Sequence, residues 1–244
     1  MEHVWLLAAL MFVAAILYSS VGHAGASGYL AAMALMNVAP EVMRPTALCL
    51  NIIVATIGTI QFARAGYFAW NIFWPFAVTS VPCAFIGGTL KLPYDYYRAV
   101  VGVVLLFAAA RLIYSARRSS ESEPKPLPLA VALIGGASIG LLAGLTGVGG
   151  GIFLSPLLLL ANWATVRQTA GVSVAFILVN SIAGLAGNLA SVQYLPPQIP
   201  FLALTVAVGG IIGSQLGSRH FAPILLRYLL AVVLVMAGCK MIFT

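Results

Sequence analysis

The stretch Leu145-Thr146-Gly147-Val148-Gly149-Gly150-Gly151 decides the fold of this chain, and SSVGHAGASG (19–28) is its counterpart near the N-terminus. Each glycine costs a helix interior about 1 kcal/mol relative to alanine, so successive glycines predict a non-helical break. The apolar segments after the breaks, 28–37 and 152–161, would rise about 15 Å as helices, half the thickness of a membrane. Non-helical backbone at that depth is tolerated only where protein or a water-filled cavity supplies hydrogen-bond partners.

The composition is that of a membrane protein. Of the 244 residues, 62% are hydrophobic and 7% are charged, whereas soluble domains carry about 25% charged residues. The 12 Lys and Arg and the 5 Asp and Glu side chains are too few to hydrate a soluble domain. The net charge of +7 is spread over segment ends and forms no aromatic-rich patch, which excludes a nucleic-acid partner. The three cysteines stand alone in apolar runs, which predicts core residues and no metal site.

Apolar segments bounded by charge, Pro or Gly predict an all-α integral membrane protein, a polytopic helix bundle. The segments cover 4–20, 28–37, 46–63, 70–90, 97–114, 129–145, 152–161, 168–191, 199–217 and 224–243. The residues before the first segment include Glu2 but no Lys or Arg, whereas a signal peptide begins with a positively charged region. We therefore expect the first segment to be part of the mature protein. The stretch SARRSSESEPKPLP (115–128) is rich in charge, Ser and Pro and predicts a linker.

The two sides of this linker are similar, which predicts an internal repeat. Glycine and basic residues recur in the same order in both: Gly22 with Gly147, Arg44 with Arg167, Gly87 with Gly213 and Arg98 with Arg227. We therefore expect a first repeat at 1–114, the linker at 115–128 and a second repeat at 129–244. The alternative explanation is that Gly-rich membrane segments resemble one another by composition alone.

The distribution of basic residues favours inverted repeats with broken or re-entrant helices at the Gly-rich turns. With a cytoplasmic linker, inverted halves place eight of the 12 Lys and Arg residues on the cytoplasmic side, whereas parallel halves place six there. We expect a multi-pass protein of the bacterial inner membrane with both termini in the periplasm. Whether the segments beside the breaks cross fully or turn back is left open.

The two short helices should begin at the breaks and point their N-termini into one shared pocket. Free N–H groups and the positive dipole end of each helix can receive an oxyanion without a buried cation. The candidate substrate-binding residues are those of the two breaks: Gly22, His23, Gly25, Ser27, Gly28, Thr146, Gly147, Gly149, Gly150 and Gly151. The alternative is that these glycines only let helices pack closely.

Polar side chains follow the third and eighth segments at helical spacing. Asn51, Ser173 and Asn180 are further candidates for contact with the substrate, although such residues also bond neighbouring membrane helices. Candidate vestibule or gating residues are Arg44, Gln61, Arg64 and Arg167; interfacial anchoring is the alternative role of the arginines.

His23 is the ionisable group expected at a break, and protonation there would link anion movement to protons. A histidine that is structurally satisfied is the alternative. Coupling to another ion is equally open at this point.

The chain resembles the TauE/SafE sulfite exporter family, also called the 4-toluene sulfonate uptake permease family. The resemblance rests on 145–151 followed by Ser155-Pro156, on the Arg-x-Thr motifs at Arg44 and Arg167, and on the two halves. It implies a permease that moves sulfur-containing anions such as sulfite, sulfoacetate or related sulfonates across the inner membrane, usually outward. The first break departs from the pattern at His23 and Ala24.

We therefore expect a non-enzymatic transporter of sulfur-containing oxyanions that works by alternating access, with no cofactor, metal or catalytic residue. A divalent-cation or other small-solute carrier is the alternative, but it needs clustered carboxylate, imidazole or thiolate ligands, and the sequence has none. An intramembrane enzyme would need a nucleophile and a base, for which Ser27 and His23 are the available pair. The substrate, the coupling ion and the oligomeric state stay open.

Overall fold

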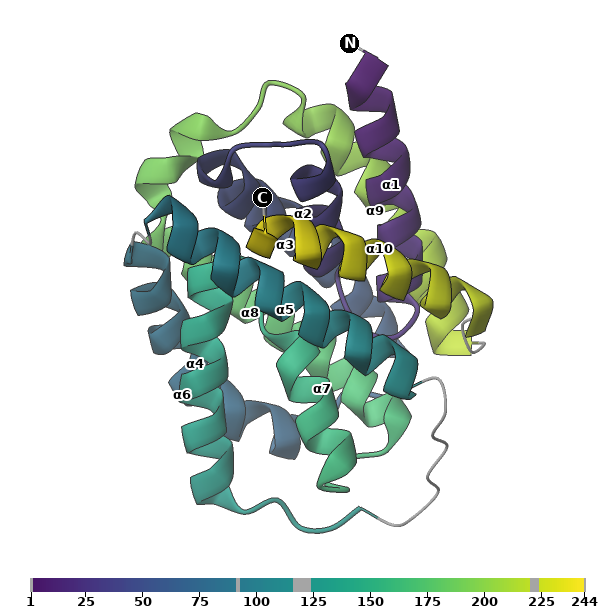
Figure 1. Cartoon of the computed structure of the whole chain (residues 1–244). Helices are drawn as coiled ribbons and strands as arrows, with labels where there is room; N and C mark the ends of the chain where they lie inside the picture. The colour runs from purple at the N-terminus through teal and green to yellow at the C-terminus, as the bar shows by residue number, and fades with distance from the viewer. Residues whose placement is uncertain (1, 91–92, 116–123, 220–223, 244) are drawn as a thin grey trace.

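A computed structural model describes residues 2–90, 93–115, 124–219 and 224–243, and this part of the chain consists of helices and loops without strands. The helices, in chain order, are α1 (Glu2–Ser19), α2 (Ala26–Leu35), α3 (Pro40–Arg64), α4 (Trp70–Thr89), α5 (Tyr94–Ser115), α6 (Leu129–Thr146), α7 (Gly151–Leu160), α8 (Val166–Gly187), the 3₁₀ helix η1 (Leu189–Tyr194), α9 (Ile199–Arg219) and α10 (Ile224–Phe243). The all-α fold class predicted from the sequence is confirmed (Figure 1).

The helices before residues 116–123 and those after them have similar lengths when they are compared in chain order. α1 and α6 have 18 residues each, and α2 and α7 have 10 each. Of the expected linker, residues 116–123 lie outside the described part of the chain, while 124–128 lead without regular structure into α6. The division into repeats at 1–114 and 129–244 stays a prediction.

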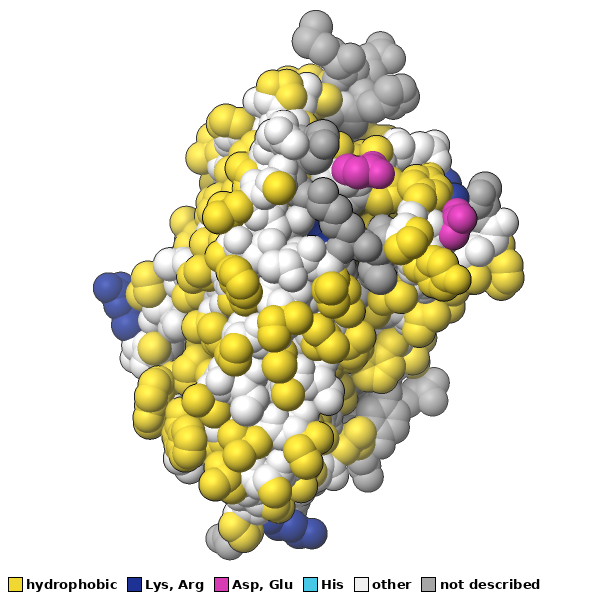
Figure 2. Space-filling view, turned by 90° about the vertical axis from the view of Figure 1, so that its left-hand side faces the viewer, with side chains coloured by type: hydrophobic (Ala, Val, Ile, Leu, Met, Phe, Trp, Pro, Cys, Tyr) yellow, Lys and Arg dark blue, Asp and Glu magenta, His cyan; other side chains and the backbone are white. Residues whose placement is uncertain are grey.

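Five of the described helices are long and apolar enough to cross a membrane, namely α3, α4, α6, α8 and most of α9. Their outward side chains are apolar: Trp70 is 63% exposed, Ile134 70% and Leu204 66%. Figure 2 shows a face on which hydrophobic side chains predominate and most of the visible charged ones stand toward the margins. Lipid is the solvent that suits such a surface, so this is a multi-pass membrane protein.

Two helices begin earlier than the sequence prediction placed them, which corrects the positions of Arg44 and Arg167. Pro40 starts α3 at a position where its fixed φ favours a helix and its missing N–H costs nothing. A capping box starts α8, in which Thr165 accepts from the Gln168 N–H and the Gln168 side chain accepts from the Thr165 N–H. Both arginines therefore lie inside helices and not in the loops before them.

The halves are interleaved, because the first helix of each packs along the fourth helix of the other. At both contacts, glycines four residues apart lie against main-chain carbonyls of the other segment: Gly136, Gly140 and Gly144 of α6 against Phe76, Ser80 and Ala84 of α4, and Gly209, Gly213 and Gly217 of α9 against Phe12 and Ile16 of α1 and Ser20 directly after it. A Cβ on any of these six glycines would lie 2.1–2.9 Å from its neighbour. Close packing, the alternative role considered for the break glycines, is thus also found at glycines outside the breaks.

Helices at equivalent places in the two halves run antiparallel. Along the contact of α3 with α8, Leu48 lies near Gly184 and Gly58 lies against Val174, so numbering rises on one helix as it falls on the other. In Figure 1, α1 and α6 likewise begin at opposite ends of the molecule. An axis that relates antiparallel equivalents lies across the helices, which supports inverted repeats.

Candidate substrate site

Both Gly-rich stretches interrupt the helices, as the sequence predicts. α1 ends at Ser19 and α2 begins at Ala26, while α6 ends at Thr146 and α7 begins at Gly151. We call residues 20–25 break 1 and residues 147–150 break 2. Their glycines have left-handed φ values: 77° at Gly22, 108° at Gly25, 83° at Gly147, 79° at Gly149 and 83° at Gly150. Side chains other than glycine rarely adopt this conformation, which explains the sequence at these turns.

The N-termini of α2 and α7 lack side-chain caps. Gly25 and Gly150 stand at the N-cap positions, and neither offers a side-chain oxygen to the free N–H groups of the first turn. These first turns are buried: Ala26 is 3% exposed and Ile152 is 4% exposed. A left-handed residue followed by a helical one directs successive N–H groups into one concavity, a geometry that binds anions. Each half therefore holds a buried, positively polarised helix end.

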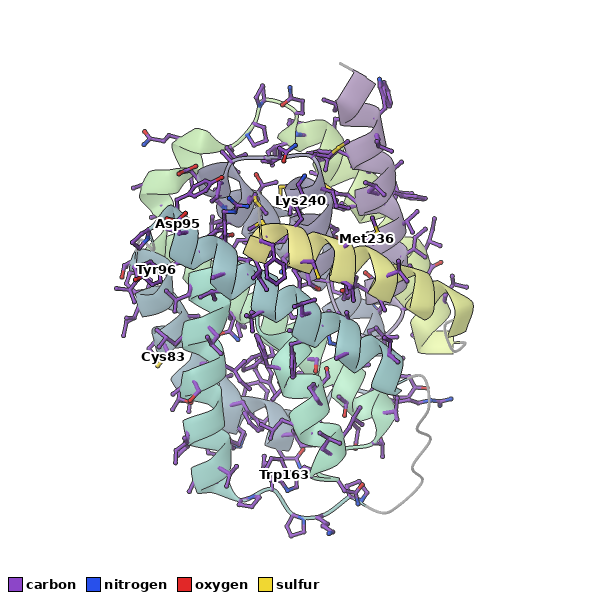
Figure 3. The ribbon with its side chains drawn as sticks, in the orientation of Figure 1. Cys83, Asp95, Tyr96, Trp163, Met236 and Lys240 are labelled. Carbon is purple, nitrogen blue, oxygen red and sulfur yellow. The ribbon has the colours of Figure 1, made fainter. Side chains whose placement is uncertain are left out.

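The opposite end of α2 is neutralised by a basic side chain. Lys240 of α10, which lies over α2 in Figure 3, donates from Nζ to the Leu35 carbonyl at 2.9 Å. A cation at the C-terminal end of a helix offsets the negative end of the dipole. The positive end at Gly25 receives no matching side chain cap, so the imbalance in α2 favours an added anion.

Break 1 connects α1 to the second half of the chain. A Cβ on Gly22 would lie 2.3 Å from Cα of Ala170, so the turn packs directly on the start of α8. Nε2 of His23 lies 3.1 Å from Oγ of Ser155 in α7, and this Oγ lies 2.8 Å from Oγ of Ser173 in α8. Three polar groups from three elements thus form one chain.

Break 2 is held by an amide and not by an ionisable side chain. Asn51 of α3 is fully buried, and its Nδ2 lies 3.4 Å from both the Val148 carbonyl and Oγ of Ser181 in α8. A Cβ on Gly149 would lie 3.0 Å from this Nδ2 and from this Oγ. Asn51 therefore fixes the backbone of break 2 between α3 and α8.

The breaks contact α8 at different places along its length, and whether they share one pocket stays a prediction. Break 1 contacts α8 at Ala170, whereas break 2 is joined through Asn51 to Ser181, about 16 Å further along the helix. The antiparallel packing of α3 and α8 places the equivalent ends of these helices at opposite levels. The first turns of α7 bridge the two, since a Cβ on Gly151 would lie 3.3 Å from the Ser173 carbonyl.

Three predicted substrate residues take positions that differ from the expectation. Ser27 and Gly28 belong to the first turn of α2, and a Cβ on Gly28 would lie 2.6 Å from Cβ of Ala14, so this glycine serves the packing of α2 on α1. Thr146 closes α6: its Oγ1 donates to the Leu142 carbonyl at 2.7 Å and accepts from the Val148 N–H at 3.4 Å. Its hydroxyl proton is committed to α6 and does not join the end of α7.

Arg44 is not the open vestibule residue that the sequence suggested. It is 6% exposed, and its guanidinium donates to three carbonyls at the C-terminal end of α4: Gly87 at 2.6 Å, Gly88 at 2.8 Å and Leu90 at 3.0 Å. A Cβ on Gly147 would lie 3.2 Å from Cγ of Arg44. Arg44 therefore joins the start of α3 to the end of α4 beside break 2, where its charge offsets the negative end of the α4 dipole.

The remaining basic candidates are accessible. Arg167 is exposed near the start of α8, where its Nη1 donates to the Tyr67 hydroxyl at 2.8 Å and its guanidinium carbon lies 5.2 Å from the ring centroid. Arg64 is exposed at the end of α3, and Gln61 one turn earlier is half-buried. These placements are compatible with a vestibule, and that role stays a proposal.

Several buried oxygen atoms have no hydrogen-bond partner within the described residues. Nδ2 of Asn180 donates to the Phe176 carbonyl at 2.8 Å, but its Oδ1 has no partner. The others near the breaks or along α3 and α8 are the hydroxyls of Tyr18, Ser19, Thr46, Thr59 and Thr169 and the amide oxygens of Asn51 and Gln61. Buried polar atoms without partners are uncommon in proteins, so these atoms indicate water or a ligand along the path.

Sequence reasoning missed three residues that hold the site together. Ser155 lies one turn after Gly151, a spacing that places both on one helix face and could have indicated it. Ser181 adjoins Asn180 and carried no separate signal. Tyr97 of α5, whose hydroxyl donates to the Thr146 carbonyl at 3.3 Å, depends on tertiary packing that no local pattern reveals. In the described part of the chain, no three His, Cys, Asp or Glu side chains could jointly hold a metal ion.

Comparison with known proteins agrees with a transporter. The model of the family described as sulfite exporter TauE/SafE matches residues 7–241. The chain is 44% identical over 240 residues to probable membrane transporter protein y4hK of Sinorhizobium fredii (strain NBRC 101917 / NGR234), with 97% of each protein covered. It is 27% identical over 213 residues to probable membrane transporter protein MJ0441 of Methanocaldococcus jannaschii, covering 81% of this chain and 77% of that protein. No solved structure matches the chain.

Proposed function

Because this multi-pass membrane transporter belongs to the sulfite exporter TauE/SafE family, we propose that it exports sulfur-containing oxyanions such as sulfite, sulfoacetate or related sulfonates. The anion is received at the N-termini of α2 and α7 and moves by alternating access. The family supports the class of substrate and the outward direction, and the two breaks support the mode of binding.

One observation carries the proposal: each half contains a 10-residue helix that begins, buried, at a left-handed glycine without a side-chain cap. Free N–H groups at such an end carry about half a positive charge and need acceptors. A tetrahedral or pyramidal oxyanion offers several acceptor oxygens to one turn of backbone. No buried cationic side chain or metal is needed for this mode of binding.

Neutral donors continue the path along α3 and α8. The Thr59 and Thr169 hydroxyls are buried without partners, and both can donate to an anion or accept from water. The amide of Asn51 supplies a further donor at break 2. Weak, neutral donors at several levels suit a carrier, because a substrate that is held too strongly is released slowly.

The interleaved packing supports a particular division into moving parts. The glycine contacts join α1 with α9 and α4 with α6 at backbone distance, so these pairs are expected to move as units. α3 packs on α9 and α8 packs on α4, which extends the units to α1–α3–α9 and α4–α6–α8. Both breaks bridge the boundary between the units, since break 1 contacts α8 and break 2 contacts Asn51 of α3. Rocking at the contact of α3 with α8 would alternate access to the site.

The antiparallel arrangement of equivalent helices supports inverted repeats, and the distribution of basic residues supports a cytoplasmic linker with both termini in the periplasm. Single cysteines placed at Ser119 and near either terminus of a cysteine-free variant would be labelled with a membrane-impermeant maleimide in intact cells and in inverted vesicles. We expect the linker cysteine to react only in inverted vesicles and the terminal ones only in intact cells. Labelling of all three from one side contradicts inverted halves.

The substrate class is tested with purified protein by two measurements: the melting temperature in the presence of each anion, and the efflux of each anion from proteoliposomes. Sulfite and sulfoacetate are expected to raise the melting temperature more than chloride at equal ionic strength; a ligand at about 100 times its dissociation constant adds about 2.7 kcal/mol. The same anions should leave loaded proteoliposomes faster than chloride does. Equal melting temperatures and equal efflux for all anions would remove sulfur oxyanions as substrates.

A further inference from the structure

We propose that His23 binds a proton together with the anion, and that Ser155 and Ser173 transmit its protonation state to the N-terminus of α7. The inference rests on the proposed function and assigns the coupling ion of the same site. It makes the carrier a proton–anion symporter with one titratable group at break 1, so export of a monovalent anion requires an outward anion gradient that exceeds the opposing proton gradient. Break 2 has no such group and serves the anion alone.

Carboxylates cannot take this role from the membrane-spanning parts of the helices. The chain has 5 acidic residues, and none lies within the interior of a described helix: Glu2, Glu41, Asp95, Glu121 and Glu123. The other two histidines are His3, in the first turn of α1, and His220, outside the described residues. Tyrosine and cysteine ordinarily titrate near pH 10 and about pH 8.5. Imidazole is the group whose ordinary pKa lies near neutrality, which leaves His23.

The hydrogen bonds around His23 define a direction in its neutral form. Nδ1 lies 3.2 Å from the Val21 carbonyl, which can only accept, so the proton of the neutral ring belongs on Nδ1. Nε2 then accepts from the Ser155 hydroxyl at 3.1 Å. The Ser155 oxygen in turn accepts from the Ser173 hydroxyl at 2.8 Å. Both hydroxyl hydrogen bonds therefore point the same way: Ser173 of α8 donates to Ser155 of α7, and Ser155 donates to the imidazole.

Protonation reverses this direction without moving a heavy atom. A proton taken from water onto Nε2 makes the ring a donor to Ser155, whose hydroxyl is then free to turn and donate to Ser173. The Ser173 hydroxyl then has its own proton available for a new acceptor. Ser173 is fully buried, and its carbonyl lies beside Gly151, the first residue of α7. One proton therefore supplies a positive charge at break 1 and a new donor beside the helix end that receives the anion.

Groups of α1 and α7 lie next to the His23 ring. α1 contributes the Tyr18 ring, whose centroid lies 6.3 Å from that of the imidazole in an edge arrangement. α7 contributes the Ser155 hydroxyl, which is bonded in turn to the Ser173 hydroxyl of α8, while the Arg167 guanidinium of α8 is exposed and bound to Tyr67. The positive ends of α2 and α7 oppose a second positive charge until an anion arrives. Proton and anion are thus expected to bind cooperatively.

The experiment measures binding of methanesulfonate to purified full-length protein between about pH 5 and 8, where imidazole titrates. This sulfonate stays fully ionised in the range, whereas sulfite exchanges a proton of its own. Wild type should bind about tenfold more tightly for each unit of pH decrease above the titration of His23, as linkage of one proton requires. Calorimetry in two buffers of different ionisation enthalpy should show the uptake of about one proton per anion.

Variants separate the ring from its relay. His23→Gln should remove the pH dependence and leave the weaker affinity seen at high pH. Ser155→Ala keeps the imidazole but removes the hydroxyl that bonds it to Ser173, so the affinity gained at low pH should shrink several-fold. Ser155→Thr keeps a hydroxyl and should restore the gain. His3→Gln, a histidine in the first turn of α1, is the matched control and should keep the wild-type slope.

Three results overturn the inference. Wild-type binding that is independent of pH, with no proton uptake, removes it and leaves the proposed function standing. A slope that persists in His23→Gln removes it as well, and the wild-type calorimetry remains decisive if that variant fails to fold. Failure of wild type to bind any sulfonate or sulfite at any pH removes the proposed function and this inference together.

Discussion

The two breaks have the same backbone but different side-chain chemistry. Each places a left-handed glycine before a buried helix of 10 residues. At break 1 the turn carries His23, which is bonded through Ser155 to Ser173. At break 2 the turn consists of Val148 and glycines, and the amide of Asn51 holds it. The backbone geometry is thus the part that both halves keep, and the side chains are the part in which they differ.

This difference separates two tasks that one symmetric site could not perform independently. Backbone N–H groups do not titrate, so a helix end receives an anion at any pH. A side chain that titrates can make the same event depend on the proton concentration. Substitutions that act on one break and spare the other test whether the tasks are divided in this way.

The largest effect is expected where the backbone itself is changed. In Gly149→Val, the side chain must adopt a φ of 79° and meets Cγ2 of Ile177 at 2.8 Å and Nδ2 of Asn51 at 3.0 Å. The strain costs about 1–3 kcal/mol and the overpacking a similar amount, and both displace the first turn of α7. Sulfite or sulfonate efflux from proteoliposomes should fall at least a hundredfold, while insertion into the membrane persists.

The matched control for this substitution is Gly66→Val. Gly66 has a φ of 77°, but a Cβ there meets nothing within 4 Å. This variant therefore carries the backbone strain without the contact, and its efflux should stay within about twofold of wild type. Full efflux in Gly149→Val would mean that break 2 does not line the site.

A reversible cross-link should have the next largest effect. A Cβ on Gly58 would lie 3.8 Å from Cβ of Val174, which suits a disulfide between α3 and α8 in a cysteine-free background made by replacing Cys49, Cys83 and Cys239. If the boundary between the moving units runs here, oxidation of the pair Gly58→Cys and Val174→Cys should reduce efflux at least tenfold. Reduction of the disulfide should restore it.

The control cross-link lies inside one moving unit. A Cβ on Gly210 of α9 would lie 3.5 Å from Cβ of Val54 in α3, also within disulfide range. Oxidation of a cysteine pair at these positions should leave efflux close to that of the reduced protein. Equal inhibition by both cross-links would contradict the division of the helices proposed above.

The elements that the sequence predicted well are those that depend on local physics. Uninterrupted apolar runs must form helices in lipid, and clustered glycines favour non-helical turns. The sequence therefore predicted both the helices and the breaks. Arg44 shows where this reasoning stops. Its partners, the carbonyls of Gly87 and Gly88, lie more than forty residues away and bear no side chain that could mark them. The contact of break 1 with Ala170 and the bond between Asn51 and Ser181 also depend on tertiary packing, which no local pattern records.

A smaller effect on efflux is expected from substitution of Arg44. Like the two breaks, Arg44 and its counterpart Arg167 differ in their surroundings, since Arg44 is buried and Arg167 is exposed. Arg44→Gln removes charge-assisted bonds to the end of α4 and leaves buried carbonyls without donors. The cost of about 2 kcal/mol should lower the melting temperature by roughly 4–8 °C. Efflux should fall only a few-fold, because Arg44 supports break 2 without lining it. An unchanged melting temperature would contradict a structural role.

The smallest effect is expected from Arg167. Its guanidinium is exposed and bound to Tyr67, so Arg167→Gln should cost less than about 1 kcal/mol and barely change the melting temperature. As a charge at a vestibule, it should instead raise the anion concentration near the opening. We therefore expect KM for the anion to rise about two- to threefold at low salt with kcat unchanged, and the difference to disappear at about 1 M salt, where the Debye length is about 3 Å. A KM that is equal to wild type at low salt would assign Arg167 to anchoring alone.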